Sequence, residues 1–166
     1  MKAALALACL LCAAPRLHAG DAAFEVRAVA PRLGLPGTSE VVLDDGGGDP
    51  VKLALGAEVL LDTSALASAE AKSDSGAWFI AVELTAAGRE HFGEITTKYQ
   101  GRRLAILING QARCAPVVNA PILDGSFEIS GEFSEAEVKA FVADLNAAAA
   151  KKEPAPAAPA ATPGSP

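Results

Sequence analysis

An apolar run followed by an Asn-Gly pair constrains the fold of this chain more than any other feature of its sequence. Leu104–Ile108 consists only of apolar residues, which is typical of a buried strand. Asn109 and Gly110 follow, and this pair is the strongest short signal for a hairpin because both turn positions need a positive φ. Gln111–Ala115 is predicted as the returning strand, which ends at Pro116 because proline cannot donate a ladder hydrogen bond. The sequence therefore predicts a hairpin with a buried first strand.

A strand and a helix are predicted just before this hairpin. Trp78–Leu84 is apolar on both faces and is therefore predicted as a central strand. The predicted helix begins after Thr85, a suitable N-cap, and ends at Gly101. Its apolar positions fall at helical spacing: Phe92, Ile95 and Tyr99. Gly88 and Gly93 each weaken a helix by about 1 kcal/mol relative to alanine. We therefore expect close packing at these glycines.

A second helix is predicted near the carboxyl end, after a strand at Phe127–Ile129. Ser134 and Glu137 have the spacing of a capping box, in which each side chain bonds the other residue's backbone N–H. The residues that follow form one apolar stripe, which we expect to pack on a sheet: Val138, Phe141, Val142 and Leu145.

The first half of the chain has weaker patterns. Short strands are expected at Phe24–Val29, Glu40–Leu43, Val51–Leu55 and Glu58–Leu61, and a short alanine-rich helix at Ser64–Lys72. The whole order of elements predicts a single α+β domain, with a mixed β-sheet and two main helices packed on one face. The short strands before Ser64 are the expected open edges of that sheet.

The two ends of the chain differ from the part between them. Lys2 is followed by the apolar run Ala3–Ala14, too short to span a membrane, and Ala19 is a suitable cleavage position. We therefore expect residues 1–19 to be a signal peptide and the mature protein to be periplasmic or secreted, without a membrane span. Residues 147–166 are rich in Ala and Pro and are expected to form a disordered tail. Residues 20–56 would hold short strands and loops, and residues 57–146 the main domain.

Charge argues against a nucleic-acid partner. The net charge is −6, and it becomes −8 without residues 1–19, because this segment holds Lys2 and Arg16 but no acid. Nucleic-acid binding depends on neutralisation of phosphates by Lys and Arg. Lys98, Arg102 and Arg103 form one small basic cluster. It is either a solvated helix end or a contact for an anion or a lipid headgroup.

No catalytic, cofactor or metal site is predicted. Without residues 1–19 the chain retains one cysteine, Cys114, and one histidine, His91. A buried apolar cysteine is the favoured interpretation of Cys114, and a thiol nucleophile paired with His91 is the alternative. Asp44, Asp45 and Asp49 lack the spacing of a calcium loop and indicate an acidic turn. A binding or structural role therefore ranks above an enzyme.

Four motifs, in order, give the second half of the chain a resemblance to a known family. They are Gly101–Gly110, Cys114–Val118, Ile122–Gly125 and Ile129–Phe133. Together with Glu58–Leu66 and the helix positions Leu84, Gly88, Phe92 and Thr96, they resemble the head of the first periplasmic domain of SecD, over residues 57–146. Three positions depart from the family pattern: Asn109 stands for Asp, Cys114 for Ser and Asp124 for Gly.

The resemblance implies a function in protein export. It implies a stand-alone, non-catalytic SecD-head-like module that binds polypeptide or an envelope protein, with peripheral association with the export machinery. Two alternatives stay open: a thiol-dependent or other hydrolase that uses Cys114, and a purely structural envelope component.

Overall fold

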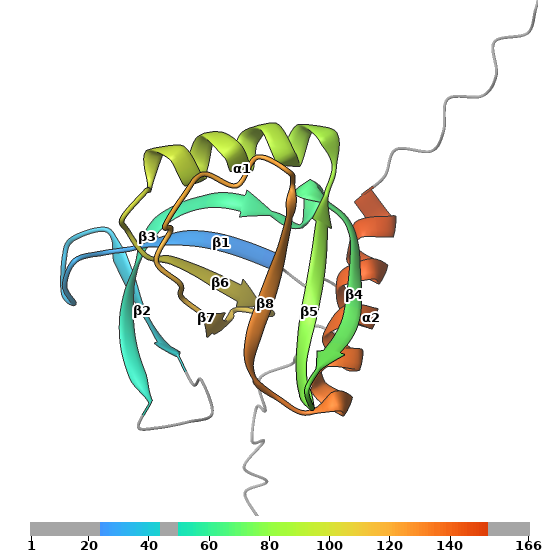
Figure 1. Ribbon diagram of the computed structural model, residues 1–166. Coiled ribbons are helices and arrows are strands. Elements are labelled where there is room, and N and C mark those ends of the chain that lie inside the picture. Colours follow the sequence, from blue (N-terminus) through green and yellow to red (C-terminus); the bar gives the residue numbers. More distant parts are fainter. Residues whose placement is uncertain (1–23, 44–49, 153–166) are drawn as a thin grey trace, which may run out of the picture.

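The computed structural model describes residues 24–43 and 50–152 (Figure 1). The elements in these ranges are β1 (Phe24–Val29), β2 (Thr38–Leu43), β3 (Val51–Asp62), the 3-10 turn η1 (Thr63–Ala65), β4 (Leu66–Asp74), β5 (Ala77–Leu84), α1 (Ala86–Lys98), β6 (Leu104–Ile108), β7 (Gln111–Cys114), β8 (Ser126–Phe133) and α2 (Glu135–Lys152). The expected signal peptide and the acidic turn with Asp44, Asp45 and Asp49 lie outside the described residues. Because α2 ends at Lys152, residues 147–152, which we expected in the tail, are helical.

The strands form two sheets where one was expected. β1, β3, β2, β7 and β6 close into a barrel in that order, and β4, β5 and β8 form a separate three-stranded sheet with β5 in the middle (Figure 1). The split arises because the buried strand β6 pairs with β1, from Phe24 opposite Ile108 to Ala28 opposite Leu104, and not with β5. The prediction of a single α+β domain is confirmed, and so is the central position of β5.

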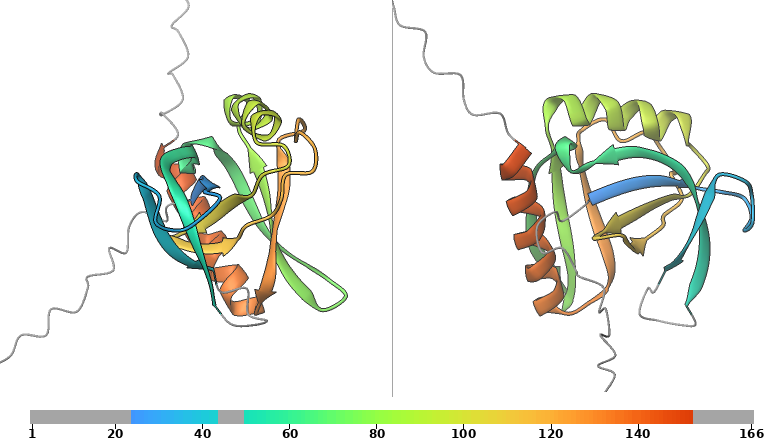
Figure 2. Two further views of the ribbon diagram at one scale, coloured as in Figure 1. Left: turned by 90° about the vertical axis from the view of Figure 1, so that its left-hand side faces the viewer. Right: turned by 180° about the vertical axis from the view of Figure 1, so that it is seen from behind.

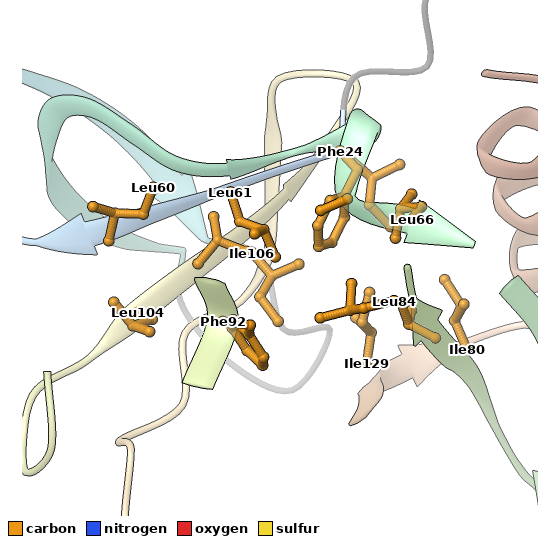
Figure 3. Close-up of a cluster of buried hydrophobic side chains, with 14 of the residues drawn as sticks. Phe24, Leu60, Leu61, Leu66, Ile80, Leu84, Phe92, Leu104, Ile106 and Ile129 are labelled. Carbon is orange, nitrogen blue, oxygen red and sulfur yellow. The ribbon is translucent and has the colours of Figure 1, made fainter. Parts of the chain in front are cut away.

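Strand β6 separates two hydrophobic cores. Its side chains alternate between the barrel core, which holds Ala105 and Leu107, and the main core, which holds Leu104, Ile106 and Ile108. The main core is built from side chains of β1, β3, β4, β5, β6, β8 and both helices. Figure 3 labels members from each of these strands and from α1. Its fully buried members include Phe24, Ile80, Ile108, Ile129 and Leu145. All five residues of β6 are apolar because each face of this strand is covered by one of the two cores.

Strand β3 is one continuous strand, although two short strands were predicted at Val51–Leu55 and Glu58–Leu61. Its first half contributes Leu53 and Leu55 to the barrel core, and its second half contributes Leu60 and Leu61 to the main core. The register with β1 shifts twice between these halves. The strand thus changes cores along its length, and this change interrupts the apolar alternation.

The prediction of a helix at Ser64–Lys72 is wrong. Only residues Thr63–Ala65 form a turn of 3-10 helix, and β4 follows from Leu66. β4 pairs with β5 from Leu66 opposite Leu84 to Asp74 opposite Ala77. Alanine favours helices only weakly, and such a propensity is overridden when a neighbouring strand supplies hydrogen bonds and an apolar surface.

Both tight hairpin turns use residues with positive φ. The predicted turn between β6 and β7 is confirmed, with φ values of 54° at Asn109 and 76° at Gly110. A second turn joins β4 to β5 through Ser75 and Gly76, with φ values of 49° and 89°. The β4–β5 hairpin projects from the body of the domain (Figure 2).

The capping box of α2 is confirmed. The Ser134 backbone N–H donates to Glu137 Oε2 over 3.0 Å, and the Glu137 N–H donates to Ser134 Oγ over 3.3 Å. We expect Ser134→Ala to lower the free energy of unfolding by about 1 kcal/mol, because the Glu137 backbone N–H in the first turn loses its acceptor. Urea unfolding of the variant and the parent measures this change. Ser130→Ala, on the exposed part of β8, is the control and should unfold like the parent.

The capping box also lowers the pKa of the Glu137 side chain. The hydrogen bond from the Ser134 side chain, followed by the one from its backbone, lowers the pKa of Glu137 below its ordinary value. A carboxylate with a lowered pKa in the folded state stabilises the fold above its unfolded pKa and loses this effect as the pH falls through the folded pKa. The benefit of the capping box should therefore decline in acid.

Candidate functional site

Cys114 and His91 do not form a nucleophile pair. Cys114 lies on β7 opposite Ile106, and burial raises the pKa of its thiol to about 12. At neutral pH this thiol stays protonated, whereas the thiolate is the reactive form. His91 lies on α1, where its Nε2 is 3.0 Å from the carbonyl oxygen of Leu60 on β3. The hydrolase alternative therefore receives no support from the surroundings of Cys114.

The predicted basic cluster is divided between two surfaces. Lys98 lines an open depression on the outer side of α1, beside Gly93 and Leu123. Arg102 and Arg103 instead line a cleft at the end of the barrel. Arg102 stacks on the ring of Tyr99, 4.8 Å from its centre, and Arg103 Nε donates to the Ala115 carbonyl over 2.8 Å. Lys98 Nζ lies 5.5 Å from the centre of the same Tyr99 ring, so Lys98 adjoins Arg102 although it does not line the cleft.

Helix α1 meets η1 at Gly88, and the predicted packing reason for this glycine is confirmed. A Cβ atom placed on Gly88 would lie 2.5 Å from the carbonyl oxygen of Ala65 and 2.9 Å from its Cβ. The same carbonyl accepts a hydrogen bond from the Thr85 N–H over 2.8 Å, just before α1 begins. Thr85 is also the predicted N-cap, whose Oγ1 accepts from the Gly88 N–H over 3.1 Å. Only glycine allows α1 to approach η1 this closely.

Helix α1 also holds the long connection between β7 and β8. The fully buried Thr96 hydroxyl donates to the carbonyl of Phe92 over 2.8 Å and accepts from the Ile122 N–H over 3.0 Å. On the preceding turn, Leu123 Cδ2 lies 3.1 Å from the position of a Cβ on Gly93. Gly88 and Thr96, two of the helix positions singled out by the sequence resemblance, therefore have structural tasks.

The outer edge of β4 is partly closed by a side chain of α2. Asn146 Nδ2 donates to the Ala69 carbonyl over 2.9 Å, and Asn146 Oδ1 accepts from the Ala69 N–H over 2.8 Å. The Asn146 side-chain amide therefore forms the two hydrogen bonds with the Ala69 backbone that a residue of a neighbouring strand would form. Sequence reasoning missed this residue, although an asparagine inside a helix is a signal because its helix propensity is low.

Beyond Ala69 the edge of β4 is open. Every second residue of an antiparallel strand directs its backbone groups to the same side, so Ala71 and Ser73 share the outward direction of Ala69. On this side their N–H and C=O groups have no hydrogen-bond partner among the described residues. Lys72 lies between them and pairs with Glu70 Oε2 over 3.3 Å. Open edges were expected at the short strands before Ser64, but β1 and β3 are paired on both sides within the barrel, and only β2 remains largely unpaired on one side, where it meets β7 at the single pair Leu43–Ala112.

Within the described ranges, no cluster of His, Cys, Asp and Glu side chains is arranged to hold a metal ion. Neither α1 nor α2 combines the length and the apolar character that crossing a membrane requires.

Comparison with known proteins relates the fold to protein translocation. Residues 39–150, about two thirds of the chain, match the family described as SecDF, P1 head subdomain. The match begins before residue 57, where we expected the related region to start. The protein translocase subunit SecD of Leptotrichia buccalis is 39% identical over 80 residues, which cover 48% of this chain and 20% of the relative. The chain thus spans about a fifth of that relative.

Two solved structures share the fold. A structure described as SecDF in the Super-membrane-facing form aligns with a TM-score of 0.63 and 24% identity, over 76% of this chain and 19% of that one. A second, described as a membrane component SecDF that enhances protein export, aligns with a TM-score of 0.62 and 23% identity, over 76% of this chain and 63% of the other.

Proposed function

The chain belongs to the family of SecDF P1 head subdomains, and from this premise we propose that its domain acts in protein export by binding extended polypeptide without catalysing a reaction. In this proposal residues 1–19 are removed as a signal peptide, and the domain works in the periplasm in peripheral association with the export machinery. The support for export is the similarity to a protein translocase subunit and to a component that enhances protein export.

The observation that carries the proposal is the open edge of β4. Ala71 and Ser73 each offer an outward N–H and C=O, and the amide of Asn146 already pairs with the preceding outward residue, Ala69. An extended peptide joins such an edge through backbone hydrogen bonds, which depend little on the sequence of the peptide. An exported polypeptide is unfolded and varied in sequence, so this mode of binding suits it.

The edge is short, and this limits the affinity. Ordering a flexible peptide costs conformational entropy that offsets much of the gain from the new hydrogen bonds. We therefore expect dissociation constants on the order of micromolar or weaker. Lys72, in the middle of the edge, is the kind of residue that protects an open strand from permanent association. Weak and reversible contact is what a moving chain requires.

A proline at the edge tests the proposal. The full chain is titrated with an uncharged, soluble, unfolded peptide rich in Val and Thr, and backbone amide shifts are followed by NMR. We expect the shifts to gather at residues 70–74. Ser73→Pro should reduce binding to this peptide about threefold or more, because it removes one outward N–H while the bonds between β4 and β5 remain.

Ser73→Ala is the matched control, since it changes the same exposed side chain but keeps the N–H. It should bind the peptide like the parent. Equal binding by Ser73→Pro and Ser73→Ala would contradict strand addition at this edge. A spectrum that does not change up to millimolar peptide would contradict polypeptide binding altogether.

A further inference from the structure

A cleft of about 620 Å³ lies at the end of the barrel where the β1–β2 loop, the start of β3 and the α1–β6 turn meet. Figure 2 shows this end of the barrel, turned toward the viewer in its left view. Ligand-binding clefts typically have volumes of roughly 300–1,000 Å³. The cleft is thus large enough to receive part of another molecule. None of its lining residues belongs to β4, so it is a different site from the open edge of that strand.

Positive charge is concentrated in this cleft although the chain as a whole is acidic. The cationic side chains that line it are Arg32, Lys52, Arg102 and Arg103, and no acidic residue is among its described lining residues. All four residues are exposed, and none forms an ion pair with a carboxylate in the described part of the chain. A net charge of −6 for the whole chain makes such a grouping unusual. Its field would attract a negatively charged ligand.

Two of the cations are held in place by the fold. The Tyr99 ring lies under the Arg102 guanidinium, and the Ala115 carbonyl accepts from Arg103 Nε. That contact leaves the two terminal nitrogens of Arg103, a pair of donors that suits a carboxylate. Arg32 and Lys52 have no hydrogen-bond or ion-pair partner in the described ranges, so they are free to reach toward a ligand.

The rest of the cleft is apolar. Leu33 and Val51 are each 45% exposed, and both stand next to a cation in the sequence, at Arg32 and Lys52. Deeper in the cleft, Leu53 and Ala54 are buried. Cations around an apolar recess match a segment in which acidic and apolar side chains alternate. A flat membrane surface fits less well, because the lining includes buried side chains that it cannot reach.

We infer that this cleft binds acidic side chains of an extended polypeptide segment, whose apolar side chains pack against Leu33, Val51 and the deeper wall. The inference rests on the proposed function for the polypeptide nature of the ligand, and it adds a second contact with a preference for acidic sequence. Contacts between exposed charges weaken with ionic strength. The acidic preference should therefore be strongest at low salt, whereas backbone binding at the β4 edge should hardly depend on salt.

The test compares three peptides of equal length in which the same apolar residues alternate with Glu, Gln or Lys. In an amide-shift titration of the full chain at low salt, the Glu peptide should bind about tenfold more tightly than the Gln peptide, since several exposed ion pairs each contribute modestly. Its shifts should gather at Leu33, Lys52 and Arg102. The double variant Arg32→Gln with Lys52→Gln should reduce this Glu-to-Gln ratio to about threefold or less.

The control removes the same charge elsewhere. Arg89→Gln with Lys139→Gln changes two exposed residues outside the cleft and should keep the tenfold ratio. Equal affinity for the Glu and Gln peptides, or a ratio unchanged in the cleft variant, would overturn the inference and leave the proposed function intact. Absence of binding by all three peptides would overturn both. Amide shifts at the cleft caused by phosphatidylglycerol vesicles but not by the Glu peptide would overturn it in favour of a lipid.

Discussion

Replacing Gly88 by valine is expected to lower the free energy of unfolding by about 3 kcal/mol or more, the upper range for overpacking. A Cβ at this position would lie 2.5 Å from the Ala65 carbonyl oxygen and 3.1 Å from its Cα, so backbone atoms would have to move. That movement would also disturb the hydrogen bond from the Thr85 N–H to the same carbonyl. Urea unfolding followed by circular dichroism measures the loss. Gly88→Ala, which adds only the Cβ, provides a milder variant if Gly88→Val does not fold.

Gly93 on the same helix is the matched control. A Cβ there would meet the end of the Leu123 side chain at 3.1 Å, and Leu123 is 69% exposed and free to rotate. Gly93→Ala should therefore leave stability unchanged or raise it, because alanine favours a helix by about 1 kcal/mol over glycine. Equal losses in Gly88→Ala and Gly93→Ala would show that the close approach of α1 to η1 is not the cause.

Replacing Thr96 by valine is expected to cost about 1–3 kcal/mol, although the two side chains have nearly the same shape. The change removes the hydroxyl that accepts from the Ile122 N–H, and it leaves that partly buried donor without a partner. Besides a lower urea midpoint, we expect faster hydrogen exchange at the Ile122 amide, since the connection between β7 and β8 loses its anchor on α1.

Thr97 offers the corresponding control one residue along the helix. Its hydroxyl donates to the Gly93 carbonyl over 2.7 Å, but the residue is exposed and no loop depends on it in the described structure. Thr97→Val should change stability by no more than about 0.5 kcal/mol. If Thr96→Val and Thr97→Val behaved alike, the role of Thr96 in holding the loop would be refuted.

Local features of the fold were predictable because their causes lie within a few residues of one another. The turn at Asn109 and Gly110 needs only residues that tolerate positive φ, and the capping box of Ser134 and Glu137 needs only a spacing of three. The burial of β6 is visible as an apolar run for the same reason. These signals sufficed for the α+β class and for the resemblance of the second half of the chain to a SecD head.

The division of the strands into two sheets depended on partners far away in the sequence. β1 pairs with β6 across about half of the chain, and this pairing covers the edge that was expected to be open at β1. In the same way, pairing with β5 turned the alanine-rich segment after Ser64 into β4. Alternation and propensity describe one strand at a time, so they cannot specify which strands meet.

The candidate sites show most clearly which features the sequence determined and which only the tertiary structure decided. The sequence by itself determined that reactive groups are few and that Gly88 must pack closely. Only the tertiary structure brought Arg32 and Lys52 next to Arg102 and Arg103, and only α2 folding along β4 placed Asn146 on Ala69. The physical reason is that an open edge or a charged cleft is defined by which neighbours are present in space. Those neighbours are set by long-range pairing, which no local pattern records.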